Sequence, residues 1–190
     1  NNSTSDNNTG LSAGTFYVTV TDANGCTDTT SVIITEPNLL VASIASSVNV
    51  SCFGGNDGSA LVTATGGTQP YSYLWSDNST SDNNTGLAAG TYYVTVTDAN
   101  GCNDTTSVII TEPNLLISSI NSYTNVSCFG ANDGSALVSA SGGTQPYSYL
   151  WSDNSTSDNN TGLAAGTYYA TVTDANGCND TTSVIITEPN

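Results

Sequence analysis

A repeat with a fixed period constrains the fold of this chain more than any other feature of its sequence. The period is 76 positions: residues 39–114 and 115–190 differ at nine of them, and residues 1–38 differ from residues 77–114 at four. Each copy must therefore be one structural unit that packs next to its neighbours. We expect the second half of a unit at 1–38, followed by complete units at 39–114 and 115–190. A window that opens inside a unit is expected to come from a longer array.

The pattern of residues within one unit predicts an all-β fold. No stretch has the helical period of 3.6, whereas apolar and polar residues alternate in short runs bounded by Gly, Pro, Asn and Asp. Six or seven short strands with an inward Trp predict a small immunoglobulin-like β-sandwich. In the first complete unit the strands are expected at 39–46, 59–65, 71–75, 91–97 and 105–113, with a short edge strand inside 76–87.

Strand alternation also predicts the core. Ala170 replaces Val94 in the last copy, which is expected to leave a small hole costing roughly 1–2 kcal/mol. Tyr93 and Leu74 are expected to point outward, and they are the residues we would examine for ligand binding. The expected inward side chains are aromatic or apolar and lie on alternate residues: Tyr71, Tyr73, Trp75, Tyr92, Val94 and Val96.

The charge of the chain excludes several classes of function. It has 16 Asp and Glu residues and no Lys, Arg or His, so its net charge is −16. Nucleic acids and anionic membranes are bound through Lys and Arg, so neither is expected as a partner. No apolar run approaches the roughly 20 residues of a membrane span, so no membrane insertion is expected. The usual catalytic bases are also missing, so we expect no enzyme and no catalytic residue.

Five cysteines predict disulfides and an oxidising, extracellular environment. Each complete unit has one cysteine in an NVSCFG segment and one in an ANGC segment. Two sets of pairings fit: Cys52–Cys102 with Cys128–Cys178 inside units, or Cys26–Cys52 with Cys102–Cys128 across junctions.

The direction of the strands distinguishes the two sets of pairings. If strand directions alternate and one strand lies between 71–75 and 91–97, Cys52 and Cys102 lie at the same end of the sandwich. This favours the pairing inside units and leaves Cys26 to a partner outside the window. Two strands in that interval would reverse the argument.

The acidic turn after 91–97 has two interpretations. Asp98, Asn100 and Asp104 offer oxygen ligands for calcium, a cation that the net charge would attract. Asp and Asn are also the usual turn formers, and their spacing does not fit an EF-hand. We favour a turn role with no cofactor and keep calcium as the alternative, which a loss of thermal stability on chelation would support.

Nearly the whole unit resembles the SprB-type repeat of very long surface proteins of Bacteroidetes, including the adhesin of gliding motility. The resemblance rests on VSCFGGNDGSALVTATGGTQPYSYLWSDNST at 50–80 and LAAGTYYVTVTDANGC at 87–102. The aromatic strand and the Gly-Thr-Tyr stretch are also similar to polycystic-kidney-disease (PKD) domains. The resemblance therefore implies tandem immunoglobulin-like (PKD-like) β-sandwich modules, each occupying one full period of 76 positions. It also implies export through the type IX secretion system, display at the cell surface and no catalytic residue.

Threonines in the repeated DTT segment are candidate glycosylation sites. Asp-Thr-Thr is similar to the acceptor used for O-glycans in Bacteroidetes, which points to Thr29, Thr105 and Thr181. An intact mass above the sequence mass would test this prediction.

These observations together predict a structural segment of a long extracellular surface adhesin or filament, in which each unit is a spacer. The expected partners are neighbouring identical repeats, or copies of the chain in a filament where one unit gives a strand to the next. The alternative is a multivalent adhesive module that binds surface polysaccharide, since many weak sites gain avidity from repetition.

Overall fold

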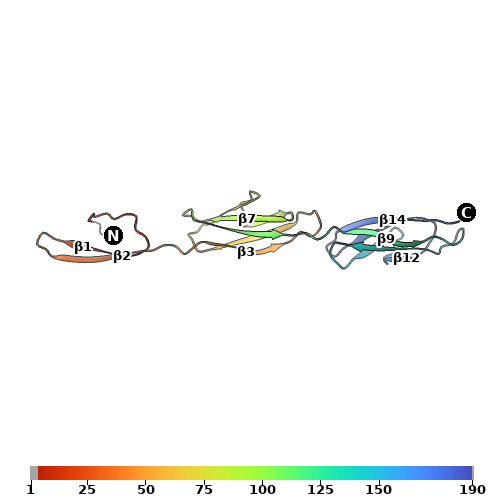
Figure 1. Ribbon diagram of the computed structural model, residues 1–190, viewed down its shortest axis with the longest axis horizontal. Coiled ribbons are helices and arrows are strands. Elements are labelled where there is room, and N and C mark those ends of the chain that lie inside the picture. Colours follow the sequence, from red (N-terminus) through yellow and green to blue (C-terminus); the bar gives the residue numbers. More distant parts are fainter. Residues whose placement is uncertain (1–3, 190) are drawn as a thin grey trace.

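The computed structural model describes residues 4–189, in which every regular element is a β-strand. From the N to the C terminus these residues form one hairpin and two β-sandwiches, which follow one another in a line (Figure 1). The predicted fold class, tandem immunoglobulin-like β-sandwiches, is confirmed. Residues 1–3 and 190 of the predicted units lie outside the described residues. Between residues 4 and 189 there is no helix long and apolar enough to cross a membrane.

The middle sandwich consists of two three-stranded antiparallel sheets. The first has the order β3-β4-β6 and contains β3 (Val41–Val48), β4 (Gly58–Thr65) and β6 (Asn83–Leu87). The second has the order β5-β7-β8 and contains β5 (Ser72–Trp75), β7 (Gly90–Thr97) and β8 (Asn103–Ile110).

The last sandwich repeats this arrangement strand for strand. Its first sheet has the order β12-β10-β9 and contains β9 (Ile117–Thr124), β10 (Gly134–Ser141) and β12 (Asn159–Leu163). Its second sheet has the order β11-β13-β14 and contains β11 (Ser148–Trp151), β13 (Gly166–Thr173) and β14 (Asn179–Ile186).

The core of each sandwich lies between its two sheets. Trp75, Val94 and Val96 are fully buried in the middle sandwich, and their inward orientation was predicted from strand alternation. The Trp75 indole donates a hydrogen bond to the Ser81 carbonyl (2.8 Å), so its polar atom is satisfied. The three predicted tyrosines are half-buried and pack against this core: Tyr71, Tyr73 and Tyr92.

Two short strands determine the course of the chain through the sandwich. β5 ends at Trp75, which pairs with Val94 in the middle of β7. β6 begins at Asn83, which pairs with Leu61 in the middle of β4. The loop 76–82 therefore crosses between the sheets at mid-height, and β6 continues in the direction of β5. Together, β5 and β6 therefore take the chain once from the N-terminal to the C-terminal end of the sandwich.

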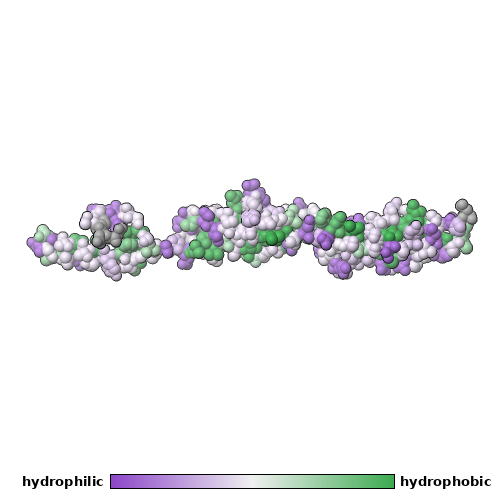
Figure 2. Space-filling model, in the orientation of Figure 1, coloured by the Kyte–Doolittle hydropathy of each residue, from purple (hydrophilic) through white to green (hydrophobic). Residues whose placement is uncertain are grey.

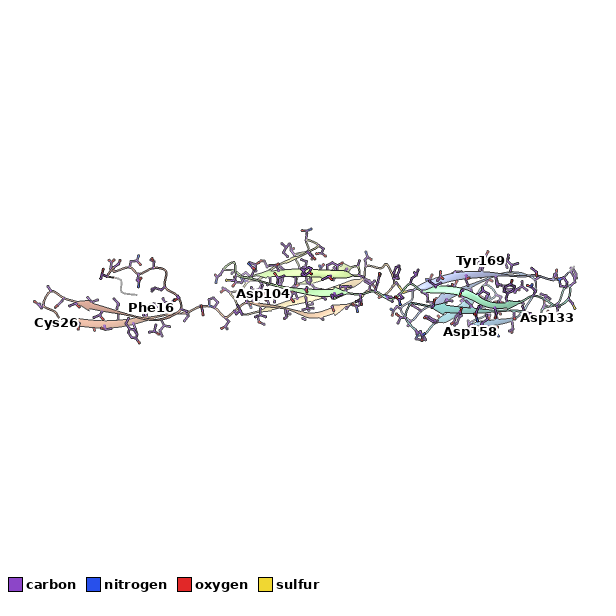
Figure 3. All side chains as sticks on the ribbon, in the orientation of Figure 1. Phe16, Cys26, Asp104, Asp133, Asp158 and Tyr169 are labelled. Carbon is purple, nitrogen blue, oxygen red and sulfur yellow. A yellow bond between two sulfur atoms is a disulfide. The ribbon has the colours of Figure 1, made fainter. Side chains whose placement is uncertain are left out.

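Each sandwich consequently has two different ends, which we call poles. The N-terminal pole of the middle sandwich holds the Gly-Gly-Thr loop (66–68) and the β7–β8 turn (98–102). The C-terminal pole holds the β3–β4 loop (49–57) and the end of β8. In Figure 3, Asp104 near the N-terminal pole of the middle sandwich and Asp133 in the β9–β10 loop of the last one lie far apart along the molecule.

The first hairpin consists of β1 (Gly14–Thr21) and β2 (Thr27–Ile34) and corresponds to β7 and β8. In the described part of the chain no second sheet covers its inner face, so Val18 is 53% exposed whereas the equivalent Val94 is fully buried. Cys26 lies at the tip of this hairpin (Figure 3).

Candidate functional site at the junction of the sandwiches

The β3–β4 loop places Cys52 at the C-terminal pole of the middle sandwich. Before the cysteine, the Val50 amide donates a hydrogen bond to the Thr111 carbonyl (2.9 Å). After it, the Gly54 amide donates to Glu112 Oε2 (2.6 Å). Both bonds attach the loop to the residues that follow β8, so Cys52 is held beside the start of the linker to the last sandwich.

The β13–β14 turn places Cys178 at the N-terminal pole of the last sandwich. The Asp174 carboxylate is buried and accepts hydrogen bonds from the amides of Thr144 (2.8 Å), Asn176 (2.9 Å) and Cys178 (2.9 Å). Burial raises the pKa of Asp174, but these hydrogen bonds together lower it by more, so the net shift is downward. An ionised carboxylate therefore fixes the turn that carries Cys178.

A disulfide joins these two poles. Cys52 bonds to Cys178 of the next unit, with a sequence separation of 126 and 5.7 Å between their Cα atoms. This Cα separation lies in the usual range for a disulfide. Beside it, Asn176 Nδ2 donates a hydrogen bond to the Ser51 carbonyl (2.9 Å). We call the disulfide and this hydrogen bond the junction latch.

The observed disulfide contradicts the predicted cysteine pairs. Cys52 does not pair with Cys102, nor Cys128 with Cys178, and the alternative pairs Cys26–Cys52 and Cys102–Cys128 are absent as well. The prediction required strand directions to alternate throughout, whereas β6 keeps the direction of β5. This places the two cysteines of one unit at opposite poles and the NVSC cysteine beside the ANGC cysteine of the next unit. Free and exposed thiols are Cys26, Cys102 and Cys128.

The predicted calcium ligands are only partly brought together. The amides of Asn100 and Cys102 both donate to Asp98 Oδ1 (2.9 Å each), and the Thr68 amide donates to Asp98 Oδ2 (2.9 Å). Asp104 lies on β8 instead, where Oδ2 accepts the Ala42 amide (2.8 Å).

Hydrogen bonds also determine the charge state of this turn. The Thr68 amide is the main cause that lowers the pKa of Asp98, so the carboxylate is ionised and paired with N–H donors. In residues 4–189 no group of three or more His, Cys, Asp or Glu side chains could hold a metal. The calcium hypothesis remains a prediction.

The predicted glycosylation sites lie on strands at the surface. Thr105 is in β8, and its hydroxyl lies 3.0 Å from the Thr95 hydroxyl on β7. The equivalent pairs join Thr29 to Thr19 at 2.9 Å and Thr181 to Thr171 at 3.0 Å. An attached glycan would take the place of this cross-strand contact, and glycosylation remains a prediction.

The outer face of the second sheet carries the side chains that were predicted to point outward. Leu74 on β5 and Tyr93 on β7 are more than half exposed, and so are their equivalents Leu150 and Tyr169. Tyr169 projects from the surface of the last sandwich (Figure 3). Each sandwich therefore presents the same apolar and aromatic pair to solvent.

Several residues of the junction were not identified from the sequence. Ser51 and Asn176 act across the junction, and Thr68 and Thr144 hold the acidic turn from the Gly-Gly-Thr loop. The contact between the loop threonine and the turn aspartate has a signal in the sequence, because the two residues are 30 positions apart in both units. The contact between Asn176 and Ser51 joins two units, so no spacing within one unit could indicate it.

Comparison with solved structures gives distant similarities, and no curated protein matches the chain. Three N-terminal domains of the bacteriophage RB49 Highly Immunogenic Outer Capsid protein (Hoc) are 18% identical, with 79% of this chain and 59% of that chain covered and a TM-score of 0.49. The C-terminal 282-residue fragment of intimin, solved with the intimin-binding domain of its translocated receptor, is 14% identical, with 80% and 64% covered and a TM-score of 0.41. The chain spans less than two thirds of either, and the fold assignment rests on the strand pairing described above.

Comparison with protein families gives a match in each complete unit. The family model of the SprB repeat matches residues 44–80 and 120–156, which run from the first strand through the cysteine loop to the segment after the Trp. SprB repeats occur in extracellular surface proteins, and a disulfide is consistent with that environment. The resemblance stated from the sequence is confirmed: a segment of each complete unit matches the SprB repeat, and these matches support a repeat module of a surface protein.

Proposed function

We propose that this chain is a spacer segment of a long extracellular surface adhesin or filament. The observation that carries the proposal is the junction: one sandwich meets the next through opposite poles, and a disulfide fastens the contact. Units joined through opposite poles extend a chain in one direction (Figure 1). Near-identical copies suit this role, since a spacer needs only the same module again.

The linker between the sandwiches supports a stiff connection. Only residues 111–116 lie between β8 and β9. The Gly143 amide donates a hydrogen bond to the Asn114 carbonyl (2.8 Å), and Leu116 is buried. The Gly-Gly-Thr loop of the last sandwich thus holds the linker at the N-terminal pole, next to the latch.

The cell surface is the proposed location. SprB repeats occur in surface proteins, and the disulfide is consistent with a compartment outside the cytoplasm. Export through the type IX system and a part in gliding motility extend this proposal. A fusion of the full-length protein with an epitope would test it, since labelling of intact cells is expected and labelling only after lysis would contradict it.

The length of purified arrays tests the spacer function. Chains with two, four and six complete units would be compared by small-angle X-ray scattering and electron microscopy. Strands of eight residues span about 26 Å, and the loops at both poles bring each unit to about 30–40 Å. The maximum dimension should therefore rise by about that amount for each added unit. A maximum dimension that stays constant or grows as the cube root of mass would refute the spacer proposal.

An adhesive module is the alternative, and the exposed pair Leu74 and Tyr93 with its copy Leu150 and Tyr169 favours it. Aromatic side chains on a repeated outer face offer weak sites that gain avidity along an array. Saturable binding of the chain to a surface polysaccharide, lost in the double variant Tyr93→Ser and Tyr169→Ser, would establish this function. The spacer proposal expects no saturable retention of either chain.

A further inference from the structure

We propose that the junction latch recurs at every junction of the array, so that each unit is bonded to the unit before it and to the unit after it. In this chain, Cys26, Cys102 and Cys128 are then the open halves of three further latches. The occupant of each half is the complementary pole of another copy of the same unit. The inference deepens the proposed spacer function, on which it rests, by assigning the interaction surface between units.

The first argument is equivalence. Cys102 occupies in the middle unit the position that Cys178 occupies in the last, and Cys128 likewise corresponds to Cys52. The local structure is also the same, because the Cys102 amide is bound to Asp98 Oδ1 as the Cys178 amide is bound to Asp174 Oδ1, both at 2.9 Å. Beside Cys128, the Gly130 amide donates to Glu188 Oε2 as the Gly54 amide beside Cys52 donates to Glu112 Oε2. Cys102 and Cys128 therefore lie in the same local structures as the bonded Cys178 and Cys52.

The second argument is the exposure of apolar side chains around the latch. Phe53 beside the bonded cysteine is 53% exposed, whereas the equivalent Phe129 beside free Cys128 is 79% exposed. Leu115 in the latched linker is 53% exposed, whereas Leu39 in the unlatched one is 82% exposed. Contact between poles thus covers apolar surface, and Figure 2 shows apolar atoms where the middle and last sandwiches meet.

The third argument is the shape and hydrogen bonding of the open N-terminal pole. Cys102, Asp98 and Gly67 line a hollow of about 260 Å³ together with the linker residues 36–40. Asn176 Nδ2 donates to both Thr144 Oγ1 and the Ser51 carbonyl. In the described part of the chain, Asn100 Nδ2 donates only to Thr68 Oγ1 (2.9 Å). An amide group has two N–H donors, so the second is available to the carbonyl that an incoming NVSC loop would supply.

Formation of each latch is an oxidation. Two thiols lose two protons and two electrons to form one S–S bond, and an oxidised dithiol-disulfide catalyst or a small disulfide accepts the electrons. A thiolate of the chain attacks the oxidant's disulfide to form a mixed disulfide. The second thiolate then displaces the reduced oxidant, which leaves as a dithiol or as two thiols.

If the latch recurs, two covalent paths run along the array, each made of disulfides joined by short backbone segments. A latch crosses from the NVSC cysteine of one unit to the ANGC cysteine of the next. From there the chain reaches the following NVSC cysteine, and the next latch, after a step equal to that from Cys102 to Cys128. The covalent path through the latches therefore crosses two units with only 26 residues of backbone (128 − 102). The path through the backbone alone needs 152 residues for the same two units (2 × 76). At about 3.5 Å per extended residue, the shorter path spans about 90 Å and the longer one about 530 Å.

This geometry limits extension even when every sandwich unfolds. Two folded units are about 60–80 Å long at the strand rise used above. A latched array can therefore lengthen only to about 1.5 times its folded length before a disulfide must be reduced. Without latches, the same two units would lengthen about seven- to ninefold. The latch therefore limits how far the spacer can be extended.

Counting thiols tests the recurrence. The chain is compared with an extended chain in which a copy of 39–114 is inserted after residue 114, both refolded in a glutathione redox buffer and alkylated under denaturing conditions. One unit adds two cysteines and one latch, so each chain should keep three free thiols, and the bonded peptides should join an NVSC segment to the next ANGC segment. One free thiol in each chain would mean pairing inside units or the junction set Cys26–Cys52 with Cys102–Cys128, and either would overturn the proposal. Five free thiols in the extended chain would also overturn it.

Force measurements test the consequence. A chain of six complete units is pulled from its ends in oxidising buffer and again after reduction. The fully stretched length per unit should rise from about 45 Å to about 265 Å on reduction, a change of about sixfold. An equal length in both buffers would overturn the latch network. Rod-like arrays without latches would leave the spacer function intact, whereas latched arrays that are compact would contradict the spacer function alone.

Discussion

Buried carboxylates are the residues on which the geometry of both poles depends. In residues 4–189 the two buried acidic side chains are Asp98 and Asp174, and the chain contains no Lys, Arg or His to pair with them. Each is instead satisfied by three backbone amides, two from its own turn and one from the Gly-Gly-Thr loop. Because backbone donors cannot titrate, the stability of each turn depends on the carboxylate alone as the pH changes.

Asp98→Asn should destabilise the middle sandwich at pH 7, and this loss should shrink as the pH falls below 3.8 and through the lower folded pKa of Asp98. The folded pKa of Asp98 lies below its ordinary value of 3.8, chiefly because of the Thr68 amide. Its stabilisation is therefore complete above that value and disappears as the pH falls through the folded pKa. An Asn amide has one acceptor oxygen, so it leaves either Thr68 or the turn amides unsatisfied. Denaturant titrations of both proteins at several pH values measure this, and a constant difference would contradict it.

Ala170→Val should stabilise the last sandwich by roughly 1–2 kcal/mol. Ala170 is fully buried at the position that Val94 fills in the middle sandwich, and the surrounding core residues are otherwise nearly the same. The matched control, Val94→Ala, should destabilise the middle sandwich by a similar amount. Chemical denaturation of the two variants measures both changes. A destabilising effect of Ala170→Val would show that the last core has already closed around the smaller side chain.

Most elements of the fold could be predicted from sequence, because alternation and turn residues are local signals. The strand 91–97 and its inward residues Val94 and Val96 illustrate this. The predicted disulfides were wrong, because the pairing depends on the direction of β6 relative to β5. The prediction assumed that each strand runs the full length of the sandwich from one pole to the other. β5 has only four residues and β6 only five, so each covers about half of that length. Strand length was the signal that could have corrected the parity argument and, with it, the choice of cysteine partners.

The Gly-Gly-Thr loop is the element that connects the linker to the acidic turn, and Gly66→Ala tests its role. Gly66 has φ +72°, and a Cβ there would collide with the carbonyl of Leu39. We expect a loss of about 2–4 kcal/mol from the middle sandwich. Gly101→Ala is the control, since its φ of +84° is also unfavourable but a Cβ would meet nothing within 4 Å. It should cost only about 1 kcal/mol. Equal losses in thermal or denaturant unfolding would contradict a steric role for Gly66.

The β7–β8 turn should keep its stability without calcium. Both Asp98 oxygens already accept backbone amides, and Asp104 is directed to the amide of Ala42. The melting temperature of the chain should therefore be the same in EDTA and in millimolar calcium. Calcium titration of the Asp104→Asn variant provides the control. A melting temperature that rises with calcium in the unmodified chain and not in the variant would establish the metal site.

At the scale of the whole molecule, repulsion between units opposes a close junction. All 16 Asp and Glu side chains carry the same sign of charge, and the chain has no cationic side chain to offset them. Screening over about 8 Å weakens this repulsion at physiological salt but not at low salt. The latch holds the two poles together against it, so an oxidised junction should be insensitive to salt.

Cys178→Ser should release this constraint and make the angle between the sandwiches variable and dependent on salt. Without the disulfide, the hydrogen bond from Asn176 to Ser51 and the linker hold the junction. Scattering curves at low and at physiological salt should then differ for the variant and coincide for the unmodified oxidised chain. Cys26→Ser is the matched control, because Cys26 is free and lies on the first hairpin. The disulfide also closes a loop with a sequence separation of 126, so its loss should lower the free energy of unfolding both sandwiches together by about 5 kcal/mol. If Cys178→Ser matched Cys26→Ser in scattering and in unfolding, the latch would have no mechanical role in this chain.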